Sequence, residues 1–185
     1  MKWISRTPIM GSIYASENDI ESVQKYVNSH LAAHKSMGES AAERMSGYGV
    51  SDIEKAKARF NSAHESAISF LMPEGELSRA RASLLFIESY RELPLLAWPR
   101  KLIDAVAELE ESMVKWRHSH ARMVERIMGR RIGTGGTSGV DYLDKTSQYR
   151  VFKDLWAVRT ILVKSDSRPD LINPSFYGFN SDNVS

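Results

Sequence analysis

The chain has 185 residues, 42% hydrophobic and 26% charged, with a formal net charge of +2 at pH 7, which are values of an ordinary globular protein and exclude a disordered chain. Basic and acidic residues alternate, so charge indicates no nucleic-acid partner. The absence of cysteine excludes disulfides, thiolate nucleophiles and iron–sulfur clusters, and leaves histidines and carboxylates as possible metal ligands.

Residues 1–15 are predicted to form an irregular lead-in, because they contain Pro8 and Gly11. Arg6 and Pro8 also interrupt what would be the apolar part of a signal peptide. No later apolar run is long enough to span a bilayer. We therefore expect a soluble, cytoplasmic protein with no membrane partner.

Three helices are predicted in the first half of the chain. The first opens at a capping pair, Ser16 and Asp19, and the second at the capping box of Ser51 and Glu54 and runs to Pro73. The third covers residues 77–92 and ends before Pro94. Between the first two, residues 35–49 contain few large apolar side chains, and we expect a mobile loop there, with a turn of helix over residues 40–44 as the alternative.

A fourth helix is unusually long. Pro99 suits its first turn, Gly129 suits the position after its last residue, and no helix-breaking residue lies between them. Roughly 30 residues exceed the usual 8–20 of a globular helix. Steps of three and four residues predict one buried stripe on this helix, made of Leu102, Val106, Leu109, Met113, Trp116, His120, Met123 and Ile127.

His120 is the polar member of that stripe. One interpretation is a core histidine whose ring nitrogens are satisfied by neighbouring carbonyls. The other is a metal or haem ligand, since a neutral imidazole in an apolar pocket commonly ligates haem iron. His118 lies on roughly the opposite side of the helix and is expected to be solvated.

The segment GRRIGTGGTSGVDYL, residues 129–143, has five glycines between Gly129 and Gly139. It lacks the lysine of a P-loop and follows a helix rather than a strand, which excludes both common phosphate-binding motifs. A helix end plus a turn explains Gly129 but explains the later glycines poorly. The alternative is that backbone amides approach a small ligand closely.

After this segment, residues 140–163 are predicted to return as one or two helices with Val151, Leu155, Val158 and Ile161 or Leu162 on a core face. Residues 165–185 are expected to form a loose C-terminal tail. With no strand pattern, the sequence predicts an all-α protein, an irregular helical bundle around one long central helix, in a single domain over residues 1–185.

The motif WRHSHARMVERIMG, followed by GTGGTSG and preceded by YRELP, resembles the C-terminal half of the tryptophan 2,3-dioxygenases and the wider superfamily of haem-dependent aromatic oxygenases. The likeness runs from about Leu84 to Val163. In that family the last histidine of the WRxxH motif is the proximal ligand of haem iron, and here it corresponds to His120. The resemblance thus implies that the long central helix bears haem b.

The threonine of the GTGG motif contacts the amino-acid end of the substrate in that family. It corresponds to Thr134, and the neighbouring Gly135 and Gly136 are expected to bind the substrate with it. No further catalytic residue is indicated. The family's preceding half, which supplies a distal histidine and the indole pocket, has no counterpart before residue 1. Because members of that family form tetramers, the resemblance implies a homo-oligomer, and a further chain that supplies the distal half is an additional expectation.

The resemblance implies a haem-dependent oxygenase acting on an aromatic amino acid, most simply one that converts L-tryptophan and O₂ to N-formylkynurenine. Two alternatives stay open. One is a peroxide-dependent ring hydroxylase of the tyrosine type, from a secondary-metabolite pathway. The other is a remnant without catalytic activity that binds haem or a partner subunit.

Overall fold

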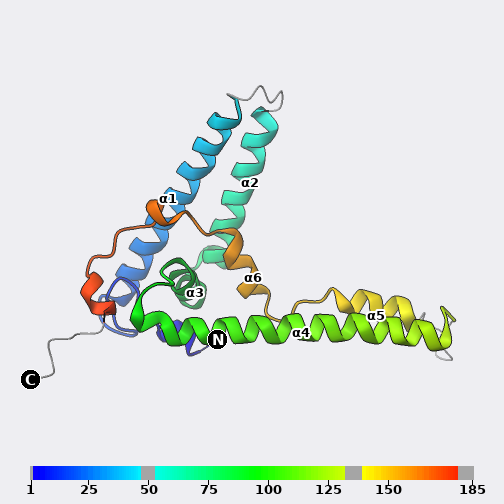
Figure 1. Cartoon of the computed structure of the whole chain (residues 1–185). Helices are drawn as coiled ribbons and strands as arrows, with labels where there is room; N and C mark the ends of the chain where they lie inside the picture. Colours follow the sequence, from blue (N-terminus) through cyan, green and yellow to red (C-terminus); the bar gives the residue numbers. More distant parts are fainter. Residues whose placement is uncertain (1, 47–52, 132–138, 179–185) are drawn as a thin grey trace, which may run out of the picture. The chain divides into compact units, whose positions relative to one another are not determined.

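The computed structural model describes residues 2–46, 53–131 and 139–178. These parts contain six α-helices and five short 3-10 helices but no strand, apart from one isolated bridge between Ile9 and Ser12 (Figure 1). The predicted all-α class is confirmed. None of the described helices has the length and apolarity needed to cross a membrane. The chain divides into two compact units, residues 1–100 with 156–185 and residues 101–155, so the single domain stays a prediction.

In the first unit, α1 (Asp19–Ser46) and α2 (Ile53–Leu71) lie side by side (Figure 1). The mobile loop predicted over residues 35–49 is wrong up to Ser46, because α1 continues through it; residues 47–49 lie outside the described residues. A Cβ atom added to Gly38 would lie 3.3 Å from Cβ of Phe60 on α2. The small residue therefore permits close helix packing rather than a break in the helix.

The helix α3 (Arg79–Ser89) forms the centre of this unit. Every residue from Ala82 to Ser89 is buried. The ring of Phe86 lies 5.2 Å from that of Tyr26, 4.7 Å from that of Tyr90 and 5.4 Å from that of Tyr177, measured between centroids. These separations are typical of packed aromatic pairs, so the cluster joins α1, α3 and the C-terminal segment in one core.

A buried ion pair attaches the lead-in to this core. Arg79 donates from Nε to Oδ2 of Asp19 over 2.9 Å and from Nη2 to Oδ1 over 2.8 Å, and Nη2 also donates to the carbonyl of Thr7. The lead-in includes the 3-10 helix η1 (Ile4–Arg6). The helix α1 begins at Asp19 and not directly after the predicted cap Ser16. The carboxylate of Asp19 therefore forms the ion pair with Arg79 at the start of this helix.

The C-terminal segment has two short 3-10 helices, η4 (Ser165–Ser167) and η5 (Pro174–Tyr177). Tyr177 is fully buried, and its hydroxyl accepts the amide of Gly11 at 2.7 Å and donates to the carbonyl of Pro8 at 3.0 Å. Gly11 has φ +81°, a conformation that favours glycine. One tyrosine therefore joins the predicted tail to the lead-in.

Three histidines lie between α1 and α2. His30 is buried with Nε2 2.8 Å from the carbonyl of Ile161, so Nε2 carries the proton of the neutral ring. His34 is buried too, and its ring stacks on that of His64 with centroids 5.7 Å apart. Burial lowers the pKa of His30, and burial together with repulsion from His64 lowers the pKa of His34. Both rings are therefore kept neutral in the fold.

These lowered pKa values predict that the fold loses stability in mild acid. A histidine whose pKa falls on folding binds more protons when unfolded, so its contribution is complete above the unfolded pKa of about 6.5 and is lost as pH falls below it. We expect the free energy of unfolding, measured with urea and circular dichroism, to fall between pH 7.5 and 5.5. The fall should be smaller in His34→Leu. Replacing the exposed His118 by Gln should keep the parent's slope, and an equal loss in parent and His34→Leu would contradict the prediction.

The second unit contains most of α4 (Ala97–Met128), which follows the 3-10 helix η3 (Pro94–Leu96). Pro99 lies in the first turn of α4, and Gly129 follows its last residue with φ +66°, as expected from the sequence. The chain returns as α5 (Gly139–Ser147) and α6 (Lys153–Thr160), two helices as foreseen. Of the predicted core face, Leu155, Val158 and Ile161 are buried. Val151, which lies before α6, is exposed, so that part of the prediction is wrong.

Glu110 on α4 is the buried charge of this unit, with 1% of its side chain exposed. Its Oε1 accepts the amide of Phe152 over 2.8 Å and also that of Val151, just before α6, while Nη1 of Arg150 lies 3.9 Å from Oε2. A carboxylate suits this place, because amides at the start of a helix have no partner within the helix. Glu110 therefore attaches the returning chain to α4.

Glu110→Ala is expected to destabilise the protein by about 1–3 kcal/mol, because two partly buried amides lose their acceptor. The neighbouring Glu111 is exposed on the same helix, and Glu111→Ala should change the free energy of unfolding by less than about 0.5 kcal/mol. Urea unfolding of both variants measures the difference. Equal effects would mean that the carboxylate of Glu110 stabilises nothing.

Candidate functional site

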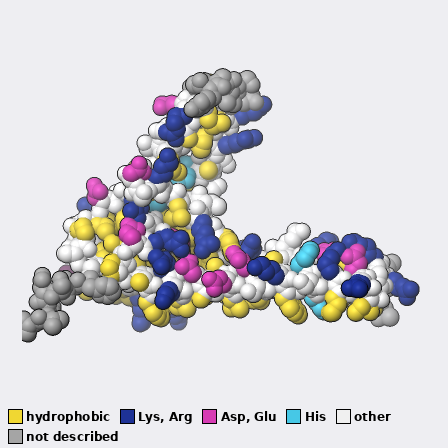
Figure 2. All heavy atoms as spheres, viewed as in Figure 1, with side chains coloured by type: hydrophobic (Ala, Val, Ile, Leu, Met, Phe, Trp, Pro, Cys, Tyr) yellow, Lys and Arg dark blue, Asp and Glu magenta, His cyan; other side chains and the backbone are white. Residues whose placement is uncertain are grey.

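The apolar stripe predicted on α4 is present, but the prediction that it is buried is wrong. Leu109, Trp116, Met123 and Ile127 are 55%, 65%, 51% and 74% exposed, and the other four members are partly exposed. Figure 2 shows hydrophobic side chains following the lower edge of α4 in that view. Periodicity identified an apolar face, but it carries no information about what covers that face.

The buried residues of α4 are instead Ile103, Ala107, Glu110 and Ala121. Each follows a member of the predicted stripe by one residue, which is a rotation of about 100° round the helix. In this unit the returning chain meets that side of α4 through polar contacts, including the amides bound by Glu110 and the bond from Arg117 to the carbonyl of Tyr149. The apolar stripe is therefore left available to a ligand or to another polypeptide.

His120 lies half-buried on this exposed stripe. The ring of Trp116, one turn earlier, stacks on the imidazole with centroids 5.3 Å apart and planes 7° apart. The stacking restricts the orientation of the imidazole. A core histidine enclosed by carbonyls, the first interpretation of the sequence, does not match this position. His118 is exposed, as expected.

The chain has five histidines, and their surroundings differ. His30, His34 and His64 belong to the packed pair α1 and α2, where His30 is a buried histidine bonded to a carbonyl. His118 projects into solvent away from the stripe. His120 therefore remains as the histidine that a ligand on the apolar face of α4 could reach.

The predicted substrate-binding residues Thr134, Gly135 and Gly136 lie outside the described residues, so their role stays a prediction. The residues on either side are described and carry five linked charges: Arg122, Glu125, Arg130, Asp141 and Asp144. Sequence reasoning did not single them out. The spacing of Arg122 and Glu125, three residues apart on one helix, was the available signal.

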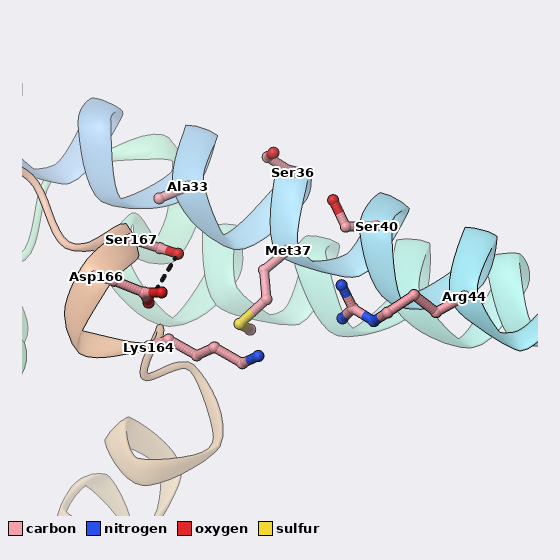
Figure 3. Close-up of a pocket in the computed structure, with 8 residues that line it drawn as sticks. All are labelled: Ala33, Ser36, Met37, Ser40, Arg44, Lys164, Asp166 and Ser167. Atoms are coloured by element: carbon pink, nitrogen blue, oxygen red, sulfur yellow. Dashed lines mark hydrogen bonds between the residues drawn. The ribbon is translucent and has the colours of Figure 1, made fainter.

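His120 is not among the residues that line the hollows described on the surface of the first unit. Figure 3 shows one between α1 and the segment that begins at Lys164, of about 380 Å³, where Arg44 and Lys164 point toward each other beside Met37. Its charged side chains are exposed, and Asp166 lies in the same hollow. It lacks the enclosed apolar lining of a typical small-molecule site. Among the described residues no group of three histidine or acidic side chains is arranged to hold a bare metal ion.

Haem fits the arrangement on α4. Its porphyrin supplies four of the iron ligands, so one axial histidine from the protein is sufficient. His120 offers that imidazole, with its ring held by Trp116. The exposed apolar side chains within about one turn of His120 on the same face, Trp116 and Met123, match the apolar surface of a porphyrin.

The comparisons with known proteins agree with the resemblance. Residues 1–162 match the family described as Tryptophan 2,3-dioxygenase, beyond the Leu84–Val163 part on which the likeness was based. A tryptophan 2,3-dioxygenase-like protein of Xanthomonas campestris pv. campestris is 44% identical, over 96% of this chain and 68% of its own length. Tryptophan 2,3-dioxygenase of Sorangium cellulosum and tryptophan 2,3-dioxygenase 2 of Ralstonia nicotianae are each 43% identical.

Both of these alignments cover 96% of this chain, which spans 45% of the Sorangium protein and 50% of the Ralstonia protein. The predicted family is thus confirmed, and with it the predicted class of enzyme, a haem-dependent oxidoreductase. By the match over residues 1–162 and these identities, the chain belongs to the tryptophan 2,3-dioxygenase family.

Proposed function

We propose that the chain binds haem b through His120 and takes part in the oxidation of L-tryptophan by O₂ to N-formylkynurenine. The reaction cleaves the C2–C3 bond of the indole and adds both oxygen atoms to the product. The observation that carries the proposal is the half-buried imidazole on the exposed apolar face of α4, in a chain of this family. The named relatives favour tryptophan over tyrosine, since their names specify tryptophan.

Haem would supply the redox-active iron at which oxygen is activated. The protein's part is to hold the group and exclude water. Trp116 limits rotation of the imidazole, and the exposed Met123, about one helical turn after His120, would lie within reach of the macrocycle. Covering a large apolar side chain is worth about 1.5–3 kcal/mol, so this face would add to the affinity from the iron–histidine bond.

The segment after α4 would bind the amino acid. The hydroxyl of Thr134 and the amides of Gly135 and Gly136 are suited to the charged ammonium and carboxylate groups of the substrate, because glycine lets the backbone approach closely. Binding at the charged end leaves the aromatic ring free to extend toward the haem. Orientation of this kind accelerates a reaction between two bound groups.

The assignment of His120 is tested by haem content. His120→Ala, expressed with haem supplied, should lose most of the bound haem because no other imidazole lies on this stripe. His118→Ala is the matched control, two residues away and exposed, and it should retain the parent's haem. Haem is measured as the pyridine haemochrome after purification. A full haem content with an unchanged Soret band in His120→Ala would disprove the assignment.

Thr134→Ala should weaken tryptophan binding by about 1.5–3 kcal/mol, the value of a hydrogen bond to a charged group, and leave the haem in place. Titration of the Soret band with tryptophan, and separately with tyrosine, measures the affinity. Thr160→Ala, at an exposed threonine on α6, should bind as the parent does. Equal affinity in Thr134→Ala and parent would remove this hydroxyl from the site, and a response to tyrosine alone would favour the ring hydroxylase.

A further inference from the structure

Two histidines of the first unit lie ring against ring between the packed helices α1 and α2. His34 belongs to α1 and His64 to α2, and their ring planes differ by 21°. His34 is only 7% exposed. The Nδ1 atoms of both rings are buried and have no hydrogen-bond partner among the described residues. Buried polar groups nearly always have a partner, so these two nitrogens call for an explanation such as a bound ion.

His30, one turn before His34 on α1, shows how a buried imidazole is held in this unit. Its Nε2 donates to the carbonyl of Ile161, at the end of α6, over 2.8 Å. Nδ1 of His30 lacks a partner as well, but the ring is fixed through its other nitrogen. This bond explains His30 as a residue that joins α1 to the returning chain. It does not explain why His34 and His64 lie together.

The pair can offer uncharged imidazole ligands. Burial, together with repulsion from His64, lowers the pKa of His34, so its ring is neutral at pH 7. A neutral imidazole has a lone pair on one of its nitrogens and is a preferred ligand of Zn²⁺, Cu²⁺ and Ni²⁺. Two neutral rings side by side can therefore share one cation.

The separation of the two rings suits a shared ion. A Zn–N bond of about 2.0–2.1 Å and a ring radius of about 1.1 Å put a ring centre roughly 3.2 Å from the metal, and two ligands of a tetrahedral ion then have ring centres roughly 5.2 Å apart. The observed distance between the ring centroids of His34 and His64 is 5.7 Å. A small rotation of either side chain is enough to close the difference.

The surroundings can supply the remaining ligands. His64 lines a hollow of about 380 Å³ between α1 and α2, together with Asn61, Glu39, Lys35 and Lys57. The hollow has room for water molecules beside polar groups. Among the described residues no third histidine or acidic side chain is arranged with the pair to hold an ion, so water completes the coordination. Ca²⁺ and Mg²⁺ require several oxygen ligands, which leaves the metals that prefer imidazole.

We propose that His34 and His64 together bind one Zn²⁺ ion between α1 and α2. Each imidazole ligates through Nδ1, and water from the hollow fills the other positions. The bound ion links the two helices and stabilises their packing. The inference does not rest on the proposed function, because neither histidine belongs to the proposed haem site.

The first experiment is calorimetric titration of the protein with ZnCl₂ at pH 7.5, after a chelator has removed any bound metal. The parent should bind one Zn²⁺ at this pair. His34→Ala and His64→Ala should each weaken that binding roughly tenfold or more, because each removes one of two protein ligands. His118→Ala, at an exposed histidine, is the matched control and should bind as the parent does. His120→Ala should keep this ion too, which separates it from the haem ligand.

No Zn²⁺ bound by the parent, or equal affinity in the parent, His34→Ala and His64→Ala, would overturn the proposal. Added Zn²⁺ should also raise the melting temperature of the parent and of His118→Ala, since an ion that binds only the folded chain stabilises it. The melting temperatures of His34→Ala and His64→Ala should stay unchanged by Zn²⁺. A rise as large as the parent's in these two variants would place the ion elsewhere.

A second measurement needs no variant, so it decides the matter even where a substitution prevents folding. The parent is loaded with one equivalent of Cu²⁺, and pulsed electron paramagnetic resonance counts the imidazole rings on the copper. Two rings are expected, and His118→Ala should give the same spectrum as the parent. A spectrum with one ring, or with none, would overturn the shared site.

Discussion

The main constraint on the second unit is the apolar face of α4, which the described residues of the chain do not cover. Leu109, Trp116, Met123 and Ile127 remain more than half exposed on α4, although each would gain about 1.5–3 kcal/mol on burial. A face of this size calls for a partner surface, and the imidazole of His120 lies within it, stacked on Trp116. In the proposed site, a haem held by His120 would cover the part of this face next to the imidazole, including Met123.

The sequence predicted the ends of the long helix correctly but predicted wrongly which of its faces is buried. The difference has a physical cause. Pro99 and Gly129 mark helix ends through local backbone chemistry, and α4 ends at Met128 as expected. Burial is decided by distant parts of the chain. The sequence predicted a loop around Gly38 because the residues there are small. The need for a small residue comes from Phe60, which packs closely against Gly38 from another helix. The burial of Tyr177 had no local signal either, since its partners Gly11 and Pro8 are more than 160 residues away.

The residues of the candidate site also differ in whether the sequence alone predicts them. His120 could be singled out from the sequence, because a polar residue interrupted an apolar period and a family motif fell on the same residue. The group of linked charges made of Arg122, Glu125, Arg130, Asp141 and Asp144 could not be assembled from the sequence. Arg122 and Glu125 share one helix face, but the pairing of Arg130 with Asp141 requires the chain to reverse between them. Local spacing reveals contacts within a helix, and contacts across a reversal depend on the fold.

The contacts between α4 and the returning chain indicate why the apolar face of α4 stays exposed. The returning chain contacts α4 through Glu110, Arg117 and Arg122, in each case by hydrogen bonds or ion pairs. Such contacts are directional and fix the register of the returning chain without covering the stripe. The polar contacts of Glu110, Arg117 and Arg122 therefore hold the returning chain on α4 while the apolar stripe around His120 stays exposed.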